Sequence, residues 1–171
     1  MGGLFGQIGM MDDDILWNNY ALTIKELKRR KLIRTRNISG ERGEHLAIEI
    51  YNATPREPNL QAAPEGTQNV DALSRKGERY AIKTVTLPHK LTGVFYGFHP
   101  PDSKEPEEKK FEYLVIVVIN DLLEPVKILE CGWDTFLKYK RWHKTMRAWN
   151  ISVTEKLEKE SRIIFPKNEG K

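Results

Sequence analysis

An acid and a lysine stand close together in one stretch of this chain, residues 67–86, whose residue types predict a β-hairpin. Residues 69–74 and 78–86 are rich in Val, Ile, Tyr and Thr, as strands are, and three residues ending in Gly77 separate them. A three-residue hairpin loop needs one residue with positive φ, which glycine adopts without steric cost. The pattern therefore predicts two antiparallel strands joined by residues 75–77.

The register of this hairpin decides which side chains meet. Pairing centred on Lys76 places Asp71 opposite Ala81. Because side chains alternate along a strand, Lys83 then lies on the same face as Asp71, diagonally next to it. A loop of two residues would instead put Lys83 on the opposite face. The alternative to a functional site is an ordinary cross-strand ion pair on a solvated face, which contributes little.

A carboxylate beside an ammonium group has the chemistry that phosphodiester hydrolysis needs. That reaction requires charge neutralisation around the phosphorus and an activated water, and a Mg²⁺ or Mn²⁺ ion held by carboxylates supplies both. A lysine close by can orient the water or stabilise the developing negative charge.

An acid at the end of one strand and a lysine on the next strand resemble the active site of the PD-(D/E)XK nuclease superfamily. The resemblance implies a restriction-endonuclease-like fold, with Asp71 as a metal-binding aspartate and Lys83 as the catalytic lysine. Residues 34–47 are similar to the first helix of restriction-enzyme-like domains, in which Glu44 matches a further catalytic, metal-binding acid.

The motif departs from the superfamily at one position. Ala81 stands two residues before the lysine, where Asp, Glu or Gln is usual, and it cannot bind a metal. Glu44 and Glu78 are the candidate replacements, and the hairpin register puts Glu78 on the face opposite to Asp71. We therefore expect Glu44 to supply the second carboxylate, while an inactive, DNA-binding relative stays open.

Basic residues gather in two clusters whose charge suits phosphate contacts. A solvated helix face is the alternative for each cluster alone, and in the first a basic helix end also suits the helix dipole. The predicted DNA-binding residues are Lys28, Arg29, Arg30, Arg34 and Arg36 in the first cluster, and Lys138, Lys140, Arg141, Lys144 and Arg147 in the second.

Composition limits the class of protein further. The chain has 171 residues, a length that predicts a single domain over residues 12–171 after a flexible leader, residues 1–11. Its formal net charge is +4. Its one cysteine, Cys131, predicts a core position, and the histidines show no zinc-ligand spacing with it. The longest apolar run, residues 114–119, is too short to span a bilayer, so we expect a soluble, cytoplasmic protein.

The periodicities predict an α/β fold, an α/β/α sandwich with a central mixed sheet. The expected helices are residues 13–31, 41–52 (started by Ser39 or Gly40), 133–147 and 155–161 (capped by Thr154), and the expected strands are residues 69–74, 78–86, 111–120, 125–130 and 149–153. Residues 53–68 and 99–110 are expected to be loops, and residues 87–98 fit either a broken segment or a strand.

Together these patterns indicate a metal-dependent DNA endonuclease of the restriction type, or a subunit of one. Its expected partners are double-stranded DNA and either a second copy, as a homodimer, or a second nuclease subunit, since cutting both strands commonly takes two sites. The first alternative is an inactive nucleic-acid-binding domain of the same fold. The second is a structural or assembly protein without a nucleic-acid role.

Overall fold

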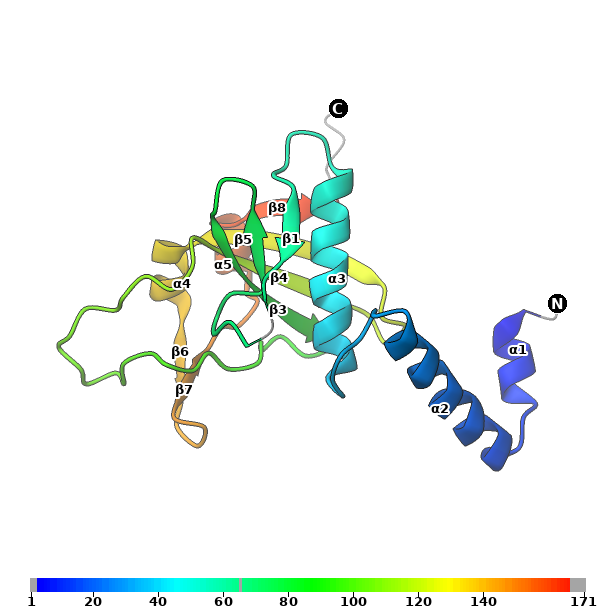
Figure 1. Ribbon diagram of the computed structural model, residues 1–171. Helices are drawn as coiled ribbons and strands as arrows, with labels where there is room; N and C mark the ends of the chain where they lie inside the picture. The colour runs from blue at the N-terminus through cyan, green and yellow to red at the C-terminus, as the bar shows by residue number, and fades with distance from the viewer. Residues whose placement is uncertain (1–2, 65, 167–171) are drawn as a thin grey trace.

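A six-stranded mixed β-sheet forms the centre of the computed structural model, which describes residues 3–64 and 66–166 (Figure 1). The strand order is β1-β2-β3-β4-β5-β8, and only β3 and β4 are parallel neighbours within it. The strands of this sheet are β1 (Leu60–Ala62), β2 (Ala72–Ser74), β3 (Arg79–Thr86), β4 (Tyr113–Ile119), β5 (Pro125–Gly132) and β8 (Arg162–Phe165).

Helices cover both faces of this sheet, as the sequence predicted. On one face α4 (Trp133–Tyr139) and α5 (Glu155–Lys159) pack over a core that includes Cys131, which is buried as expected. On the other face α3 (Ile38–Ala53) packs over a second core. All but the first residue of β4 is buried, which confirms the expectation of a strand covered on both sides.

The hairpin of β2 and β3 has the predicted register. Ala72 pairs with Tyr80 and Leu73 with Arg79, so the pairing is centred on Lys76. Gly77 has a φ of 82°, the left-handed conformation that the loop requires. The first strand is shorter than expected, because β2 contains only the last three residues of the predicted range 69–74.

Two helices precede the body of the molecule. The predicted first helix is confirmed as α2 (Asp13–Arg29), where the Asp12 side chain accepts a hydrogen bond of 2.9 Å from the backbone N–H of Ile15. Residues expected to form a flexible leader include a short helix, α1 (Leu4–Gly9), and residues 1–2 lie outside the described part. Both helices project away from the sheet (Figure 1), and neither has a buried residue. Within the described residues, no helix combines the length and apolarity needed to cross a bilayer.

Three local predictions are corrected by the structure. The cap of α3 is Asn37, which accepts a hydrogen bond from the N–H of Gly40, so the helix begins before Ser39. Residues 53–68 are not all loop, because β1 pairs there with β2. β8 was not predicted, and as an edge strand it forms through pairing with the distant β5.

The predicted helix over residues 133–147 is wrong beyond Tyr139. There the chain turns into a two-stranded hairpin of β6 (Arg141–His143) and β7 (Ala148–Asn150). Trp142 and Trp149 are cross-strand partners with ring centroids 5.2 Å apart, and this aromatic pair favours the hairpin over a continued helix. The last predicted helix is confirmed as α5, with Thr154 as its cap.

Candidate functional site

Helix α3 lies directly against strand β3 because Gly43 has no side chain. A Cβ atom at Gly43 would stand 1.9 Å from Oγ1 of Thr84, far inside contact distance. Glycine is therefore required for this close approach. The contact holds the first turns of α3 against the end of β3, and the next residue of the helix is Glu44.

Glu44 is held among charged groups that come from three other segments of the chain. Arg34 Nη2 donates a hydrogen bond of 2.9 Å to its carboxylate. Partial burial, and after it the negative charge of Asp71, raise the pKa of Glu44 to about 7, while the charges of Arg34 and Lys83 oppose the shift. These interactions show that Glu44, Asp71, Arg34 and Lys83 lie within electrostatic reach of one another.

Asp71 stands where the chain enters β2. The backbone N–H of Ile82 donates a hydrogen bond of 2.7 Å to Oδ2 of Asp71, which fixes the carboxylate against β3. Burial raises the pKa of Asp71 above its ordinary value, although this hydrogen bond and the charges of Lys83 and Arg34 act in the opposite direction. Two carboxylates with raised pKa values thus lie within electrostatic reach of each other, and a bound cation would stabilise the ionised form of both.

Lys83 projects from the same face of β3 as Ala81, as the register requires. Its Nζ atom lies 4.9 Å from the ring centroid of the fully buried Phe95, a cation–π contact that positions the ammonium group. Ala81 is itself fully buried and offers no ligand atom.

Arg34 has a role that the sequence did not reveal, since it was predicted to contact DNA. Its guanidinium joins Glu44 to Glu41, with Nε 3.3 Å from Oε2 of Glu41. Burial would raise the pKa of Glu41, but hydrogen bonds from Thr35 and Arg34 outweigh it and lower that pKa. The spacing of Glu41 and Glu44, three residues apart on a helix, is the signal that could have identified Glu41 as a further partner of Arg34.

The carboxylates present fit a hard divalent cation of the Mg²⁺ kind. Among the described residues, no group of three or more His, Cys, Asp or Glu side chains could hold a metal ion. Mg²⁺ does not need such a group, because it is commonly bound by one or two carboxylates, waters and substrate phosphates. Asp71 and Glu44 are two carboxylates that fit this description. Glu78 is not a competitor, since its carboxylate accepts a hydrogen bond from Ser74 at the hairpin turn.

The first basic cluster is distributed over two environments. Arg29 and Arg30 both form ion pairs with Glu26 on the exposed surface of α2. Lys28 and Arg36 are exposed, whereas Arg34 belongs to the carboxylate site.

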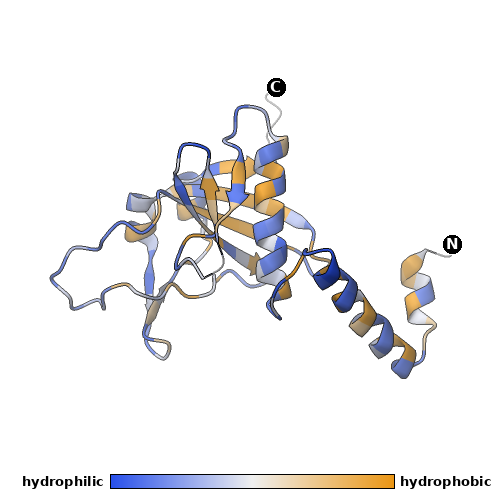
Figure 2. Ribbon diagram, in the orientation of Figure 1, coloured by the Kyte–Doolittle hydropathy of each residue, from blue (hydrophilic) through white to orange (hydrophobic). Residues whose placement is uncertain are grey.

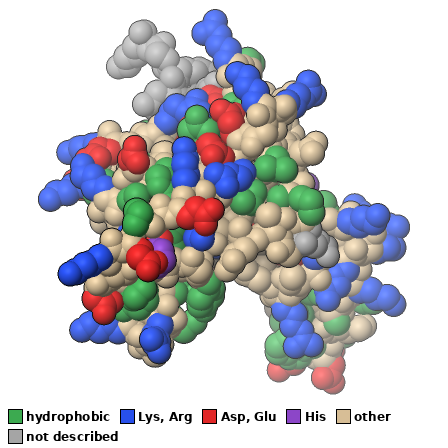
Figure 3. Space-filling view, turned by 60° about the vertical axis from the view of Figure 1, so that its left-hand side comes forward, with side chains coloured by type: hydrophobic (Ala, Val, Ile, Leu, Met, Phe, Trp, Pro, Cys, Tyr) green, Lys and Arg blue, Asp and Glu red, His purple; other side chains and the backbone are tan. Residues whose placement is uncertain are grey.

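The second basic cluster is divided by the unexpected hairpin. Lys140 forms a 2.7 Å ion pair with Glu107 in which both side chains are about nine-tenths buried, so it stabilises the fold and is not free for phosphate. Lys138 pairs with Glu160 on the surface. The exposed basic residues of the β6–β7 hairpin are Arg141, Lys144 and Arg147. On the face in Figure 3, Lys and Arg side chains are spread among Asp and Glu side chains.

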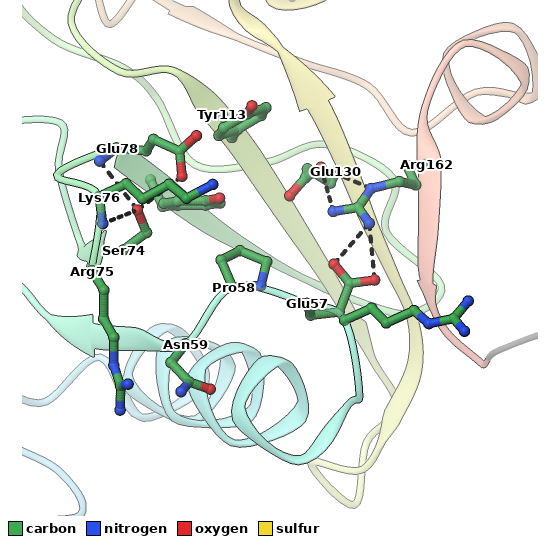
Figure 4. A pocket seen from close by; sticks show the side chains of 12 residues that line it. Glu57, Pro58, Asn59, Ser74, Arg75, Lys76, Glu78, Tyr113, Glu130 and Arg162 are labelled. Atoms are coloured by element: carbon green, nitrogen blue, oxygen red, sulfur yellow. Dashed lines mark hydrogen bonds and ion pairs between the residues drawn. The ribbon is translucent and has the colours of Figure 1, made fainter.

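A separate cavity of about 530 Å³ lies at the turn end of the β2–β3 hairpin, and the candidate acid Glu78 is among the residues that line it (Figure 4). An ion-pair network closes one side of it. Arg162 pairs with Glu130 and Glu57 at 2.8 and 2.7 Å, and the hydroxyl of Tyr51 donates a hydrogen bond of 2.6 Å to Glu130. Both carboxylates are nearly buried, and among the described residues Oε2 of Glu57 has the Arg162 guanidinium 2.7 Å away but no hydrogen-bond partner. The ion pairs tie β5 and β8 to the segment after α3.

Comparison of the chain with protein-family models and with curated protein sequences gives no match. The functional argument therefore depends on the site itself.

Proposed function

We propose that this protein is a metal-dependent DNA endonuclease of the restriction type, or a subunit of one, with a restriction-endonuclease-like fold. The observation that carries the proposal is the convergence of Asp71, Glu44 and Lys83, in which each carboxylate has a raised pKa and a lysine stands beside them. Clusters of perturbed titratable groups mark functional sites more often than structural ones. The six-stranded mixed sheet with helices on both faces is compatible with this fold.

Asp71 and Glu44 would hold the Mg²⁺ or Mn²⁺ ion, which supplies charge neutralisation and a water of lowered pKa when it is bound. Asp71 is fixed for this role by the Ile82 N–H. Lys83, held by Phe95, donates a hydrogen bond to the attacking water or to a phosphate oxygen. Arg34 neutralises Glu44 before the substrate arrives.

The test is cleavage of supercoiled double-stranded plasmid by the full chain with Mg²⁺ or Mn²⁺, with any required partner subunit present. Asp71→Asn and Lys83→Ala should each abolish cleavage and leave the circular dichroism unchanged, because neither side chain lies in a hydrophobic core. The matched controls are Asp134→Asn and Lys159→Ala, two exposed residues outside the site, which should cut normally. Near-normal metal-dependent cleavage by either site variant would refute the assignment.

A second candidate function is a catalytically inactive nucleic-acid-binding domain of the same fold. The observation in its favour is Ala81, fully buried at the position where a third ligand is usual. An inactive domain would bind Mn²⁺ no better than its Asp71→Ala variant, whereas the nuclease would bind Mn²⁺ more tightly than that variant.

A further inference from the structure

The N-terminal helices expose an unusual amount of apolar surface. Nine of the sixteen large hydrophobic side chains that the described residues expose lie between Leu4 and Leu22, including Trp17, which is 70% exposed, and Tyr20. Figure 2 shows hydrophobic residues along α1 and α2, which project beyond the sheet and its covering helices. Apolar surface of this extent on a projecting segment marks an interaction site.

Four apolar residues of α2 form one stripe, and Ile15 and Leu22 lie on the opposite side of the helix. Trp17, Tyr20, Ile24 and Leu27 follow one another at intervals of three, four and three residues, which is the spacing of a helix-pairing seam. The same spacing continues to Asp13 at the first residue of α2 and to Lys31, one residue past its C-cap. Both of these charged residues are exposed.

The charges at the ends of the stripe select one partner and one orientation. If a second α2 lies antiparallel and the pairing is centred on Leu22, Trp17 faces Leu27 and Tyr20 faces Ile24 of the other copy. The same register sets Asp13 against the Lys31 of the other copy, at both ends. Parallel pairing would bring identical charges together, which is unfavourable.

We propose that α2 is a self-association surface on which a second copy of this chain docks with its own α2 antiparallel. The groove beside the stripe, lined by Trp17, Tyr20 and Ile24 together with Arg36 and Ile38, widens the surface that the second copy covers. The seam is short, so the dimer is in the weak class of interfaces. This inference is independent of the proposed nuclease activity, because it uses no residue of the carboxylate site.

Sedimentation velocity of the full chain, from about 1 to 100 µM, tests the surface. The parent protein should pass from monomer to dimer over this range, and Trp17→Glu should raise the dissociation constant at least about tenfold, since buried tryptophans dominate such interfaces. Leu122→Glu changes an equally exposed hydrophobic residue outside the N-terminal helices and should leave the dimer intact. A parent that stays monomeric overturns the proposal, and if that monomer binds phosphatidylglycerol vesicles, the stripe is a membrane surface instead.

Charge exchange tests the orientation. Asp13→Lys alone and Lys31→Asp alone should each weaken the dimer, because each places like charges opposite one another at both ends, and the double variant should restore it. Single variants that dimerise like the parent would overturn the antiparallel arrangement. Circular dichroism should be the same for all these variants, since the substituted side chains are exposed.

Discussion

Replacing Glu44 by Gln should stabilise the fold at neutral pH, and increasingly so as the pH rises. The pKa of Glu44 is raised to about 7 in the folded protein, mainly by burial and then by Asp71, whereas an unfolded glutamate titrates near about 4.3. Between these values the folded state keeps a proton that the unfolded state has lost. The free energy of unfolding of the parent therefore falls as the pH rises, by about 1.4 kcal/mol per pH unit.

Integrated over this window, ionised Glu44 costs the folded protein up to about 3 kcal/mol above pH 7 and nothing below about pH 4. The side chain is 27% exposed and the Gln variant loses the ion pair with Arg34, so we expect a net gain of about 1–2 kcal/mol at pH 8. The pKa of Asp71 is also raised in the folded protein, but Asp71 is present in both the parent and the variant, so it does not contribute to the difference between them.

The assay is urea unfolding of the parent and of Glu44→Gln at pH 5, 6, 7 and 8, followed by circular dichroism. Glu49→Gln is the control, since Glu49 is exposed on the same helix. The stability difference between the Glu44→Gln variant and the parent should grow with pH, and Mg²⁺ should stabilise only the parent. A difference that is constant across this range, or a variant less stable than the parent at pH 8, would refute the reasoning.

Three further predictions concern other parts of the structure. Gly43→Ala should lower the free energy of unfolding by about 1–3 kcal/mol and reduce cleavage, because the added Cβ pushes α3 away from β3; unchanged urea denaturation would count against this close packing. Arg162→Met leaves two nearly buried carboxylates without their partner and should destabilise by about 3 kcal/mol, and an unchanged urea midpoint would show that the network is neutral. Replacing the exposed cations of the β6–β7 hairpin by Ala should weaken binding to all DNA sequences alike and flatten the slope of log affinity against log salt by up to about 0.9 per lost phosphate contact. The same slope in the triple variant would exclude this hairpin, with its Arg141, Lys144 and Arg147, from the DNA contact.

The parts of the fold that the sequence predicted well are local. The β2–β3 hairpin follows from one glycine at the right loop position and from two strand-like runs beside it. Helix α2 follows from an acidic start and a regular apolar spacing. In both cases the residues that determine the structure lie within one element or one turn.

The predictions that were wrong concern parts of the fold that depend on contacts between distant residues. Strands β1 and β8 are edge strands whose pairing partners supply the order that their own residues do not. The residues after Tyr139 have a mixture of basic and aromatic side chains that suits a helix face as well as a hairpin. The hairpin is stabilised by Lys140, whose partner Glu107 is 33 residues away in the sequence, and no local pattern predicts that ion pair.

In the candidate site, too, some residues are positioned by local structure and others by contacts between distant parts of the chain. The hairpin register, which is local and predictable, brings Asp71 and Lys83 within electrostatic reach of each other. Glu44 joins them because Gly43 lets a helix rest on β3, and Arg34 joins because it pairs with that helix. Arg34 pairs with two glutamates in the structure, and its predicted contact with DNA stays a prediction.

The most direct test of the central claim is the position of Mn²⁺ in crystals of the parent protein, located by its anomalous scattering. We expect one Mn²⁺ with oxygen ligands from both Asp71 and Glu44, at about the 2.0–2.2 Å distances of small hard cations, and with Lys83 beside it. The same soak of Asp71→Asn should show that site empty. A Mn²⁺ ion held by other side chains, or cleavage-competent protein in which neither carboxylate binds the ion, would contradict the assignment.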